Sequence, residues 1–189
     1  MENRILSLYQ TKNTIFTASE IGLIWGEDNL NKLKASLKYY IDKGNLIHLR
    51  RGIYAKLEYN IYEAAAKIYS PSYISFETVL RNEGVIFQHY ERIFAAGCFS
   101  REIELTNGQK IVYRKIKKTV LLNQHGVRKE DGFSIATKER AFLDMIYINP
   151  DYFFDNLKNI DWKECLALAP IYGNKKTEEH INFYKKNYA

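Results

Sequence analysis

Residues 17–55 constrain the fold more than any other part of the chain, because signals for two helices follow each other closely there. Thr17 and Glu20 match a capping box, in which each side chain binds a free backbone amide at the start of a helix. Gly26 predicts the end of that helix, and a longer helix is expected over 28–43. Apolar residues recur on the longer helix at the i, i+3, i+4 spacing of a face packed on a core: Leu30, Leu33, Leu37, Tyr40 and Ile41.

The segment after the long helix has the pattern of a β-hairpin. Gly44 stops the helix, and two short apolar runs at 45–49 and 53–55 are joined through Arg50-Arg51-Gly52. A further helix and a short extended segment are expected before Thr17. This order of elements predicts a winged helix-turn-helix domain over residues 1–58.

The opposite face of the 28–43 helix is polar, basic and carries an aromatic hydroxyl, which suits the major groove of DNA. Each piece taken alone also fits a solvated amphipathic helix and ordinary turn arginines, but their order favours DNA binding. The residues expected to approach bases are Asn31, Lys32, Ala35, Ser36 and Tyr39. Those expected to bind phosphates or enter the minor groove are Lys38, Arg50 and Arg51.

The distribution of charge agrees with a polyanionic partner. The chain of 189 residues has a formal net charge of +6. Residues 28–56 contain seven bases and two acids, and residues 110–129 contain seven bases and no acid, whereas 130–164 contain eight acids and four bases. Two basic zones therefore alternate with more acidic ones.

The second basic zone includes apolar residues between its bases, so 110–118 predicts a strand with one apolar and one cationic face. A merely solvated face is the plain alternative. The functional interpretation is a second nucleic-acid surface made of Arg114, Lys115, Lys117 and Lys118. Replacing all four with Ala is then expected to flatten the salt dependence of DNA binding.

The rest of the chain predicts a second domain over 59–189 and an α+β fold class overall. Its pattern indicates mixed helices and strands with a small antiparallel sheet, the strands falling within 92–122. Helices are expected at 61–69, from Ser75 as a cap to Asn82, from Thr137, over 152–158, after Asp161 as a cap, and at 176–187.

Several classes of protein are excluded by composition. No run approaches the roughly 18 to 20 apolar residues of a membrane span, and the N-terminus lacks the pattern of a signal peptide, so we expect a cytoplasmic protein without membrane contact. Cys98 and Cys165 form no metal or redox motif, and the four histidines lie far apart. We therefore expect no metal and no cofactor.

Catalytic patterns are weak. Ser75 and Glu77 resemble a nucleophile and an acid, but no histidine lies at a suitable position, and a serine opening a helix is usually a cap. Pro150-Asp151 followed by Asp161-Trp162-Lys163 has the spacing of a metal-dependent nuclease motif, but the intervening segment favours a helix and not the required strands. We expect no enzymatic activity.

Two C-terminal segments carry a family resemblance. Residues 70–80, SPSYISFETVL, with Gly84, and residues 135–144, IATKERAFLD, resemble the AbiEi antitoxin family, as does RGIYA at 51–55. The resemblance covers the chain from about residue 4 to the final helices. It departs from the family at Thr78-Val79, where the family often has Ser-Ala, and at Lys138 and Arg140, where Pro and Lys are common.

The resemblance implies a transcriptional regulator and antitoxin of a type IV toxin-antitoxin system, which defends against phage by abortive infection. The N-terminal domain would bind inverted repeats in its own promoter as a repressor, and the antitoxin domain would counteract a nucleotidyltransferase-like toxin without needing a stable complex. The antitoxin-domain motif comprises Ser75, Glu77, Glu139, Arg140 and Asp144. The last three also predict a helix face tied by charge pairs.

Two other functions stay open at this point. The first is an interaction protein that masks the toxin directly, with the winged helix as a docking module. Loss of repression in Arg50→Ala and Arg51→Ala variants that still protect against the toxin would separate the two roles. The second is an enzyme that modifies the toxin, for which no catalytic residues are found. Palindromic repeats favour a monomer that pairs cooperatively on DNA.

Overall fold

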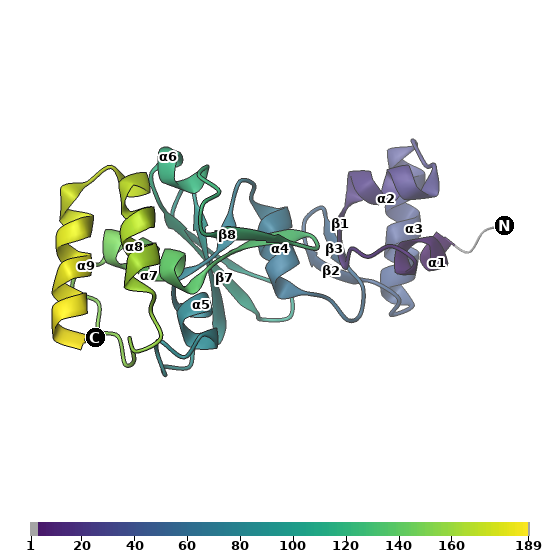
Figure 1. The fold of residues 1–189 in the computed structure, drawn as a ribbon. Coiled ribbons are helices and arrows are strands. Elements are labelled where there is room, and N and C mark those ends of the chain that lie inside the picture. The colour runs from purple at the N-terminus through teal and green to yellow at the C-terminus, as the bar shows by residue number, and fades with distance from the viewer. Residues whose placement is uncertain (1–3, 189) are drawn as a thin grey trace.

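The computed structural model describes residues 4–188 and has a mixed α+β fold (Figure 1). A small three-stranded sheet with helices lies at one end, and a six-stranded sheet with further helices forms the rest. The last two helices lie at the end farthest from the N-terminus. The described part of the chain includes no helix long and apolar enough to cross a membrane.

The N-terminal elements follow the local sequence signals closely. The capping box of Thr17 and Glu20 is formed, and Gly26 ends the helix in a left-handed conformation with φ of 60°. The long helix is capped by Asn29, whose side chain accepts hydrogen bonds from the backbone amides of Asn31 and Lys32. The elements are α1 (Arg4–Tyr9), β1 (Ile15–Thr17), α2 (Ala18–Trp25), α3 (Leu30–Asp42), β2 (Ile47–Arg50) and β3 (Ile53–Ala55).

One expected core residue is exposed. Leu33 and Leu37 are buried, but Leu30 is 69% exposed. Leu30 is the first residue of α3, where the helix has only just begun and no neighbouring element covers it. The periodicity placed it on the apolar face correctly, but the core does not extend to that end of the helix.

The three-stranded sheet is antiparallel, in the order β1-β3-β2, and packs on both of its faces. Phe16 and Tyr54 contact the core of α1 to α3, whereas Ile15 and Ala55 belong to the larger core of the C-terminal elements. The predicted boundary after residue 58 falls between β3 and α4 (Ile61–Ile68), the helix on which the second face of this sheet rests.

The C-terminal elements surround the larger sheet. In chain order they are α4, β4 (Tyr73–Ile74), α5 (Phe76–Asn82), β5 (Arg92–Gly97), β6 (Arg101–Glu104), β7 (Lys110–Lys115), α6 (Lys118–Leu121), β8 (Val127–Glu130), β9 (Phe133–Ala136), α7 (Lys138–Ile148), α8 (Trp162–Leu168), the 3-10 helix η1 (Ala169–Tyr172) and α9 (Lys175–Tyr188). Residues 152–158 form no helix, contrary to expectation. They form an irregular segment in which Phe154 is buried in the core and Tyr152 packs against it, whereas Phe153 is exposed.

The prediction of a small antiparallel sheet for the C-terminal region is wrong. The sheet has six strands in the order β6-β7-β5-β4-β9-β8, and the pairs β5–β7 and β4–β9 are parallel. Strand β7 lies between β5 and β6 in the sheet. It pairs antiparallel with β6, its hairpin partner, and parallel with β5. Alternating hydrophobicity indicates strands but does not identify their neighbours.

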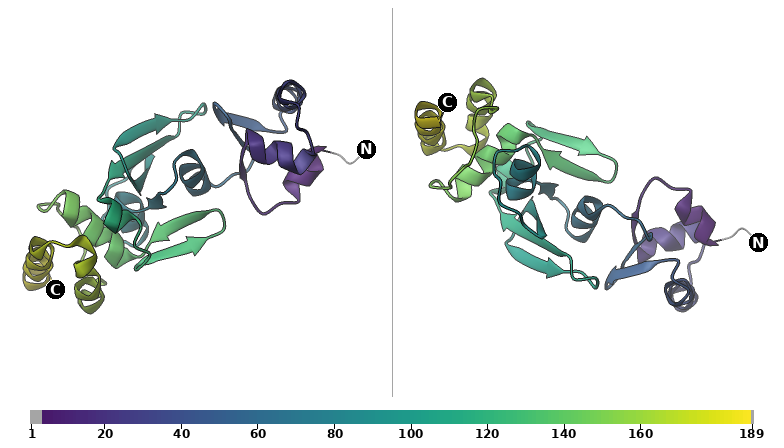
Figure 2. Two further views of the ribbon diagram at one scale, coloured as in Figure 1. Left: turned by 90° about the horizontal axis from the view of Figure 1, so that it is seen from above. Right: turned by 90° about the horizontal axis from the view of Figure 1, so that it is seen from below.

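Helices cover both faces of this sheet. The hydroxyl of Tyr113 on β7 donates to the backbone carbonyl of Ala65 on α4, with an O···O distance of 2.7 Å. On the other face, α5 packs on β5 and contacts α7. Figure 2 shows the β6–β7 and β8–β9 hairpins extending on either side of α4, toward the N-terminal elements.

Candidate functional site

The exposed face of α3 is the most prominent polar surface of the N-terminal elements. Asn31, Lys32, Ala35, Lys38 and Tyr39 are all exposed, and the buried Leu33 and Leu37 lie on the opposite side. The face is therefore free to meet a ligand, with amide, ammonium and phenol groups in water around a small central residue.

Ser36 is tied to another helix. It is half-buried, and its hydroxyl accepts a hydrogen bond from Nη1 of Arg4 at 3.1 Å. The same guanidinium pairs with Glu27 through Nη2, also at 3.1 Å. Ser36 thus lies at the edge of the exposed face and helps to hold α1 on α3, a role that helical periodicity does not reveal.

The charges on the exposed face interact only weakly with the protein. Lys38 Nζ lies 2.9 Å from Asp42 Oδ2, but both side chains are mostly exposed. Lys43 Nζ lies 5.9 Å from the centre of the Tyr39 ring. Such pairs in water are worth about 0–1 kcal/mol, so these groups can exchange partners at little cost.

The hairpin arginines point to different surroundings. Arg51 is exposed in the turn before Gly52, whose φ is 77°. Arg50 faces the C-terminal region, where Arg101 and, to a smaller extent, Arg50 lower the pKa of the Tyr69 hydroxyl. The two arginines therefore lie in different surroundings, because β2 packs against the C-terminal region and only the turn after it is exposed.

The β6–β7 turn fixes this hairpin in place. The backbone amide of Thr106 donates to the carbonyl of Leu49 at 3.1 Å, and its hydroxyl donates to the carbonyl of His48 at 2.6 Å. The hairpin is thus bound to the larger region and does not project freely.

The second basic surface loses one of its four predicted members. Arg114 pairs with the buried Glu77, and its guanidinium carbon lies 4.5 Å from the centre of the Phe94 ring and 5.2 Å from that of Phe76. Strand alternation directs Arg114 beneath α5. Lys115, Lys117 and Lys118 are exposed, and they surround the start of α6, well away from α3 (Figure 1).

Three residues of the antitoxin-domain motif, Ser75, Arg140 and Asp144, form a buried polar cluster with two tyrosines. We call it the Asp144 cluster, and it comprises Tyr73, Ser75, Arg140, Asp144 and Tyr172. Arg140 Nε lies 3.2 Å from Asp144 Oδ1, and neither side chain is exposed. The remaining guanidinium nitrogens donate to the carbonyls of His125 and Val120 at 2.8 and 2.7 Å, and to the Tyr73 hydroxyl at 3.0 Å. The i,i+4 charge pair is as predicted, but it is enclosed in the core and not on a helix surface.

Asp144 is bound on both oxygens. Oδ1 accepts from the Tyr172 hydroxyl at 2.7 Å, and Oδ2 accepts from the hydroxyls of Ser75 and Tyr73 at 2.7 and 2.9 Å. Burial raises the pKa of Asp144, while Arg140 and the three hydroxyls oppose that shift. Burial would lower the pKa of Arg140, but Asp144 and the tyrosines raise it overall, so the guanidinium keeps its charge.

Ser75 is not a cap by its side chain. Its hydroxyl is directed to Asp144 and makes no capping hydrogen bond to α5, although Ser75 occupies the capping position. The next residue, Phe76, has φ of 54°, an unusual conformation for a bulky side chain. The requirements of the Asp144 cluster therefore override the local capping preference.

Glu139 also has a structural position. It is buried, it accepts a hydrogen bond from the backbone amide of Asp161 at 3.2 Å, and it lies 3.5 Å from Lys138 Nζ. Asp161 caps α8 as expected, by accepting from the amides of Lys163 and Glu164. It lies on a helix start and not on a strand, unlike the acids of a metal-dependent nuclease.

Residues 4–188 contain no group of three or more His, Cys, Asp or Glu side chains suited to a metal ion.

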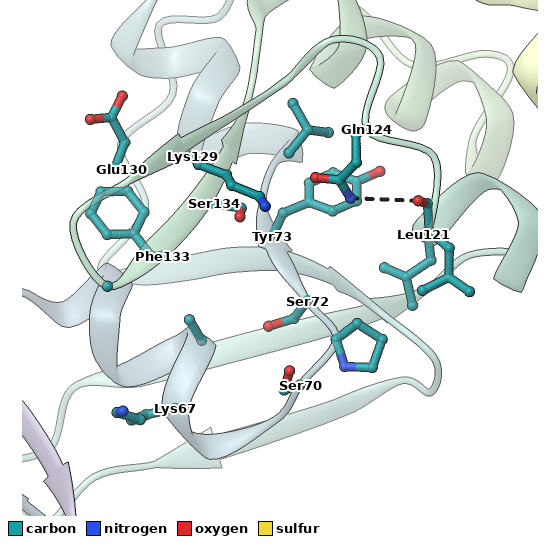
Figure 3. Close-up of a pocket in the computed structure, with 15 residues that line it drawn as sticks. Lys67, Ser70, Ser72, Tyr73, Leu121, Gln124, Lys129, Glu130, Phe133 and Ser134 are labelled. Carbon is teal, nitrogen blue, oxygen red and sulfur yellow. Dashed lines mark hydrogen bonds between the residues drawn. The ribbon is translucent and has the colours of Figure 1, made fainter.

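A feature that the sequence did not indicate is a groove of about 590 Å³ between the end of α4 and the β8–β9 hairpin. Its lining includes Lys129 and several hydroxyl groups (Figure 3). The groove joins residues far apart in the sequence, so no local motif could have identified it.

Comparison with known proteins supports the fold but does not identify a family. No family model matches the chain, and neither does any curated protein. Among solved structures, the crystal structure of the RV2827C protein from Mycobacterium tuberculosis is similar, with a TM-score of 0.53 and 8% sequence identity. The match covers 98% of this chain and 70% of that chain. At this identity it shows a shared fold.

Proposed function

We propose that this protein is a DNA-binding transcriptional autorepressor and the antitoxin of a type IV toxin-antitoxin system. Its N-terminal elements act as a winged helix-turn-helix that binds inverted repeats in its own promoter. The C-terminal region counteracts a nucleotidyltransferase-like toxin without enzymatic activity of its own. The observation that carries the DNA-binding role is the exposed, basic face of α3.

The arrangement of elements supports a winged helix. A helix and a strand precede α2 and α3, and a hairpin follows them, with β3 between β1 and β2 in the sheet. Helix α3 is 13 residues long and buries only one side. In helix-turn-helix proteins the second helix of the motif enters the major groove, which the free face of α3 would do here.

The structure refines the set of proposed DNA contacts. Asn31, Lys32, Ala35 and Tyr39 would approach base edges, and Lys38 and Arg51 would bind phosphates. Ser36 is bound to Arg4 within the protein, so we assign it no direct base contact. Arg50 is half-buried on β2, before the exposed turn, so we rank it below Arg51 as a phosphate contact.

The antitoxin role is supported by the resemblance of residues 70–84 and 135–144 to the AbiEi family. Ser75, Arg140 and Asp144 within these segments are buried. They would therefore shape the C-terminal region, and exposed residues around them would contact the toxin.

The test is a titration of the purified protein with the DNA directly upstream of its own gene, beside a scrambled duplex, at two salt concentrations. We expect a preference of about a thousandfold for the upstream DNA. An Asn31→Ala/Tyr39→Ala variant should lose this preference, whereas a Lys186→Ala variant on α9 should keep it. Equal, salt-sensitive binding of both duplexes would contradict the proposal.

A second candidate is an interaction protein that masks the toxin directly. An exposed aromatic surface beside α9 favours it, since Phe153, Phe183 and Tyr188 are 69%, 57% and 44% exposed. Exposed aromatic groups are common at protein interfaces. Protection that survives Arg51→Ala but is lost in Phe153→Ala/Phe183→Ala, together with co-purification of the toxin, would favour this second function.

A further inference from the structure

The groove between α4 and the β8–β9 hairpin lies where β4 and β9 diverge. These strands pair only at Ile74 and Ile135, so the Ser70–Ser72 segment separates from the first residues of β9. The resulting space has a volume of about 590 Å³. Pockets for small molecules usually measure about 300–1,000 Å³.

Hydrogen-bond donors face this space from both walls. Lys129 on β8 is paired in register with Ser134 on β9, so their side chains lie on the same face of the hairpin. Figure 3 shows the Lys129 ammonium and the Ser134 hydroxyl directed into the groove, with Ser70 and Ser72 on the opposite wall. The Ser72 hydroxyl donates to the backbone carbonyl of Tyr69 at 2.6 Å, so the groove offers a ligand one cation and the hydroxyl groups of Ser70 and Ser134.

The groove contains one lysine that forms no ion pair with the described residues. Within residues 4–188, the ion pairs formed by side chains do not include Lys129. Its neighbour Glu130 also belongs to the lining, but the Glu130 carboxylate points away from the Lys129 ammonium (Figure 3). Lys67, at the edge of the lining, is neutralised by Glu20 on α2. Lys129 is therefore the cation available to an incoming anion.

The other part of the lining is apolar. Pro71, Leu121, Val127 and Phe133 all contribute to it. An occupant that matches both parts would carry an anionic group at one end and an apolar or aromatic body at the other.

We propose that this groove binds a small phosphate monoester with an apolar body. A phosphate group has three terminal oxygens, which can accept from an ammonium group and from hydroxyls on two walls together, whereas a carboxylate has two. The body lies against the apolar lining. This ligand site is independent of the proposed DNA-binding function.

The experiment uses the full chain and phenyl phosphate as the probe, measured by calorimetric titration and by amide chemical shifts in NMR. We expect saturable binding with a Kd of roughly 1 mM or tighter, and shifts at Gly132 and Ser134. Lys129→Gln should weaken binding by about tenfold, and Ser134→Ala by a smaller factor. Arg128→Gln is the matched control, because it removes an equal charge from the adjacent residue, which does not line the groove.

Four results would overturn the proposal. The first is the absence of saturable binding, and the second is equal binding of benzoate, which would show that phosphate is not preferred. The third is an equal loss in Arg128→Gln and Lys129→Gln, which would show that only the overall charge matters. Binding that requires a DNA duplex and excludes phenyl phosphate would assign the surface to phosphodiesters and would equally refute a monoester site.

Discussion

Helices α3 and α7 each carry an i,i+4 pair of a base and an aspartate, and the two pairs lie in opposite surroundings. Lys38 and Asp42 on α3 have side-chain exposures of 76% and 59%, whereas Arg140 and Asp144 on α7 have none. Water screens the first pair, so its members can exchange partners. The second pair is surrounded by oriented hydroxyls and carbonyls, and removing either member leaves a buried charge without compensation.

This contrast separates the residues that determine the fold from those available for binding. The segments that carry the family resemblance include Ser75, Arg140 and Asp144, and all three lie in the core. The exposed face of α3 contributes little to stability, but it presents charges to a partner. A motif residue that is buried is thus a better indicator of the fold than of the binding surface.

The largest effect is expected for Asp144→Ala, which would leave the Arg140 guanidinium buried without its counter-charge. The free energy of unfolding should fall by about 3–5 kcal/mol in urea titrations. Asp42→Ala is the matched control on the exposed pair and should change it by less than about 0.5 kcal/mol. Similar losses in both variants would show that burial does not distinguish the pairs.

Arg114→Ala tests whether the pair of the half-buried Arg114 with the buried Glu77 behaves like the pair of Arg140 with Asp144. Glu77 would remain buried, and one of its oxygens already lacks a hydrogen-bond partner. We expect a loss of about 3 kcal/mol in urea unfolding. Lys115→Ala, at the next and exposed position, should leave the unfolding free energy within about 0.5 kcal/mol. An unchanged unfolding free energy in Arg114→Ala would contradict the stabilising role of its pair with Glu77. Arg114 would then again be a candidate for the basic surface.

Gly126→Ala tests the close approach beside the Asp144 cluster. Gly126 has φ of 71°, and an added Cβ would lie 2.9 Å from Arg140 Cβ. The strain and the clash together should cost about 2–3 kcal/mol. Gly26 also has a positive φ, but an added Cβ there would meet no atom within 4 Å. Gly26→Ala should therefore lower the free energy of unfolding by only about 1 kcal/mol. Thermal unfolding of both variants measures the difference, and equal losses would exclude the steric contribution.

On the exposed side, Asn31→Ala and Tyr39→Ala should each weaken binding of the upstream DNA by about 1–3 kcal/mol, since each would remove a base contact. Their unfolding free energies should stay within about 0.5 kcal/mol of the parent. Ser36→Ala, on the same helix but bound to Arg4, should have a smaller effect on DNA affinity. If Ser36→Ala weakened DNA binding more than Asn31→Ala or Tyr39→Ala, the edge of α3 that carries Ser36 would be the part that enters the groove of DNA.

The smallest effect is expected for the Lys115→Ala/Lys117→Ala/Lys118→Ala variant. If these lysines contact phosphates, the slope of log K against log salt should decrease by up to about 0.9 per lysine, with specificity retained. Titrations at several salt concentrations measure this slope. An unchanged slope would leave the three lysines as a solvated surface.

The sequence predicted the N-terminal elements well because their boundaries depend on neighbouring residues. The capping box at Thr17 and the glycine at residue 26 act within one helical turn. Strand order and the burial of Arg114 depend on contacts between distant segments, and these were not predicted. The same holds for Ser75, whose hydroxyl prefers a distant carboxylate to the local amides.

The larger core extends through α4 to the three-stranded sheet beneath α3. A substitution that destabilises the C-terminal region should therefore also alter the DNA-binding curve. Ile15 and Ala55 pack with Ala64 and Ala65, so the sheet that supports α3 depends on the C-terminal region for one of its faces. A destabilised C-terminal variant would therefore contain fewer binding-competent molecules, each with unaltered intrinsic affinity. In a titration, the concentration at half-saturation would rise by the inverse of the competent fraction, while the stoichiometry stayed constant.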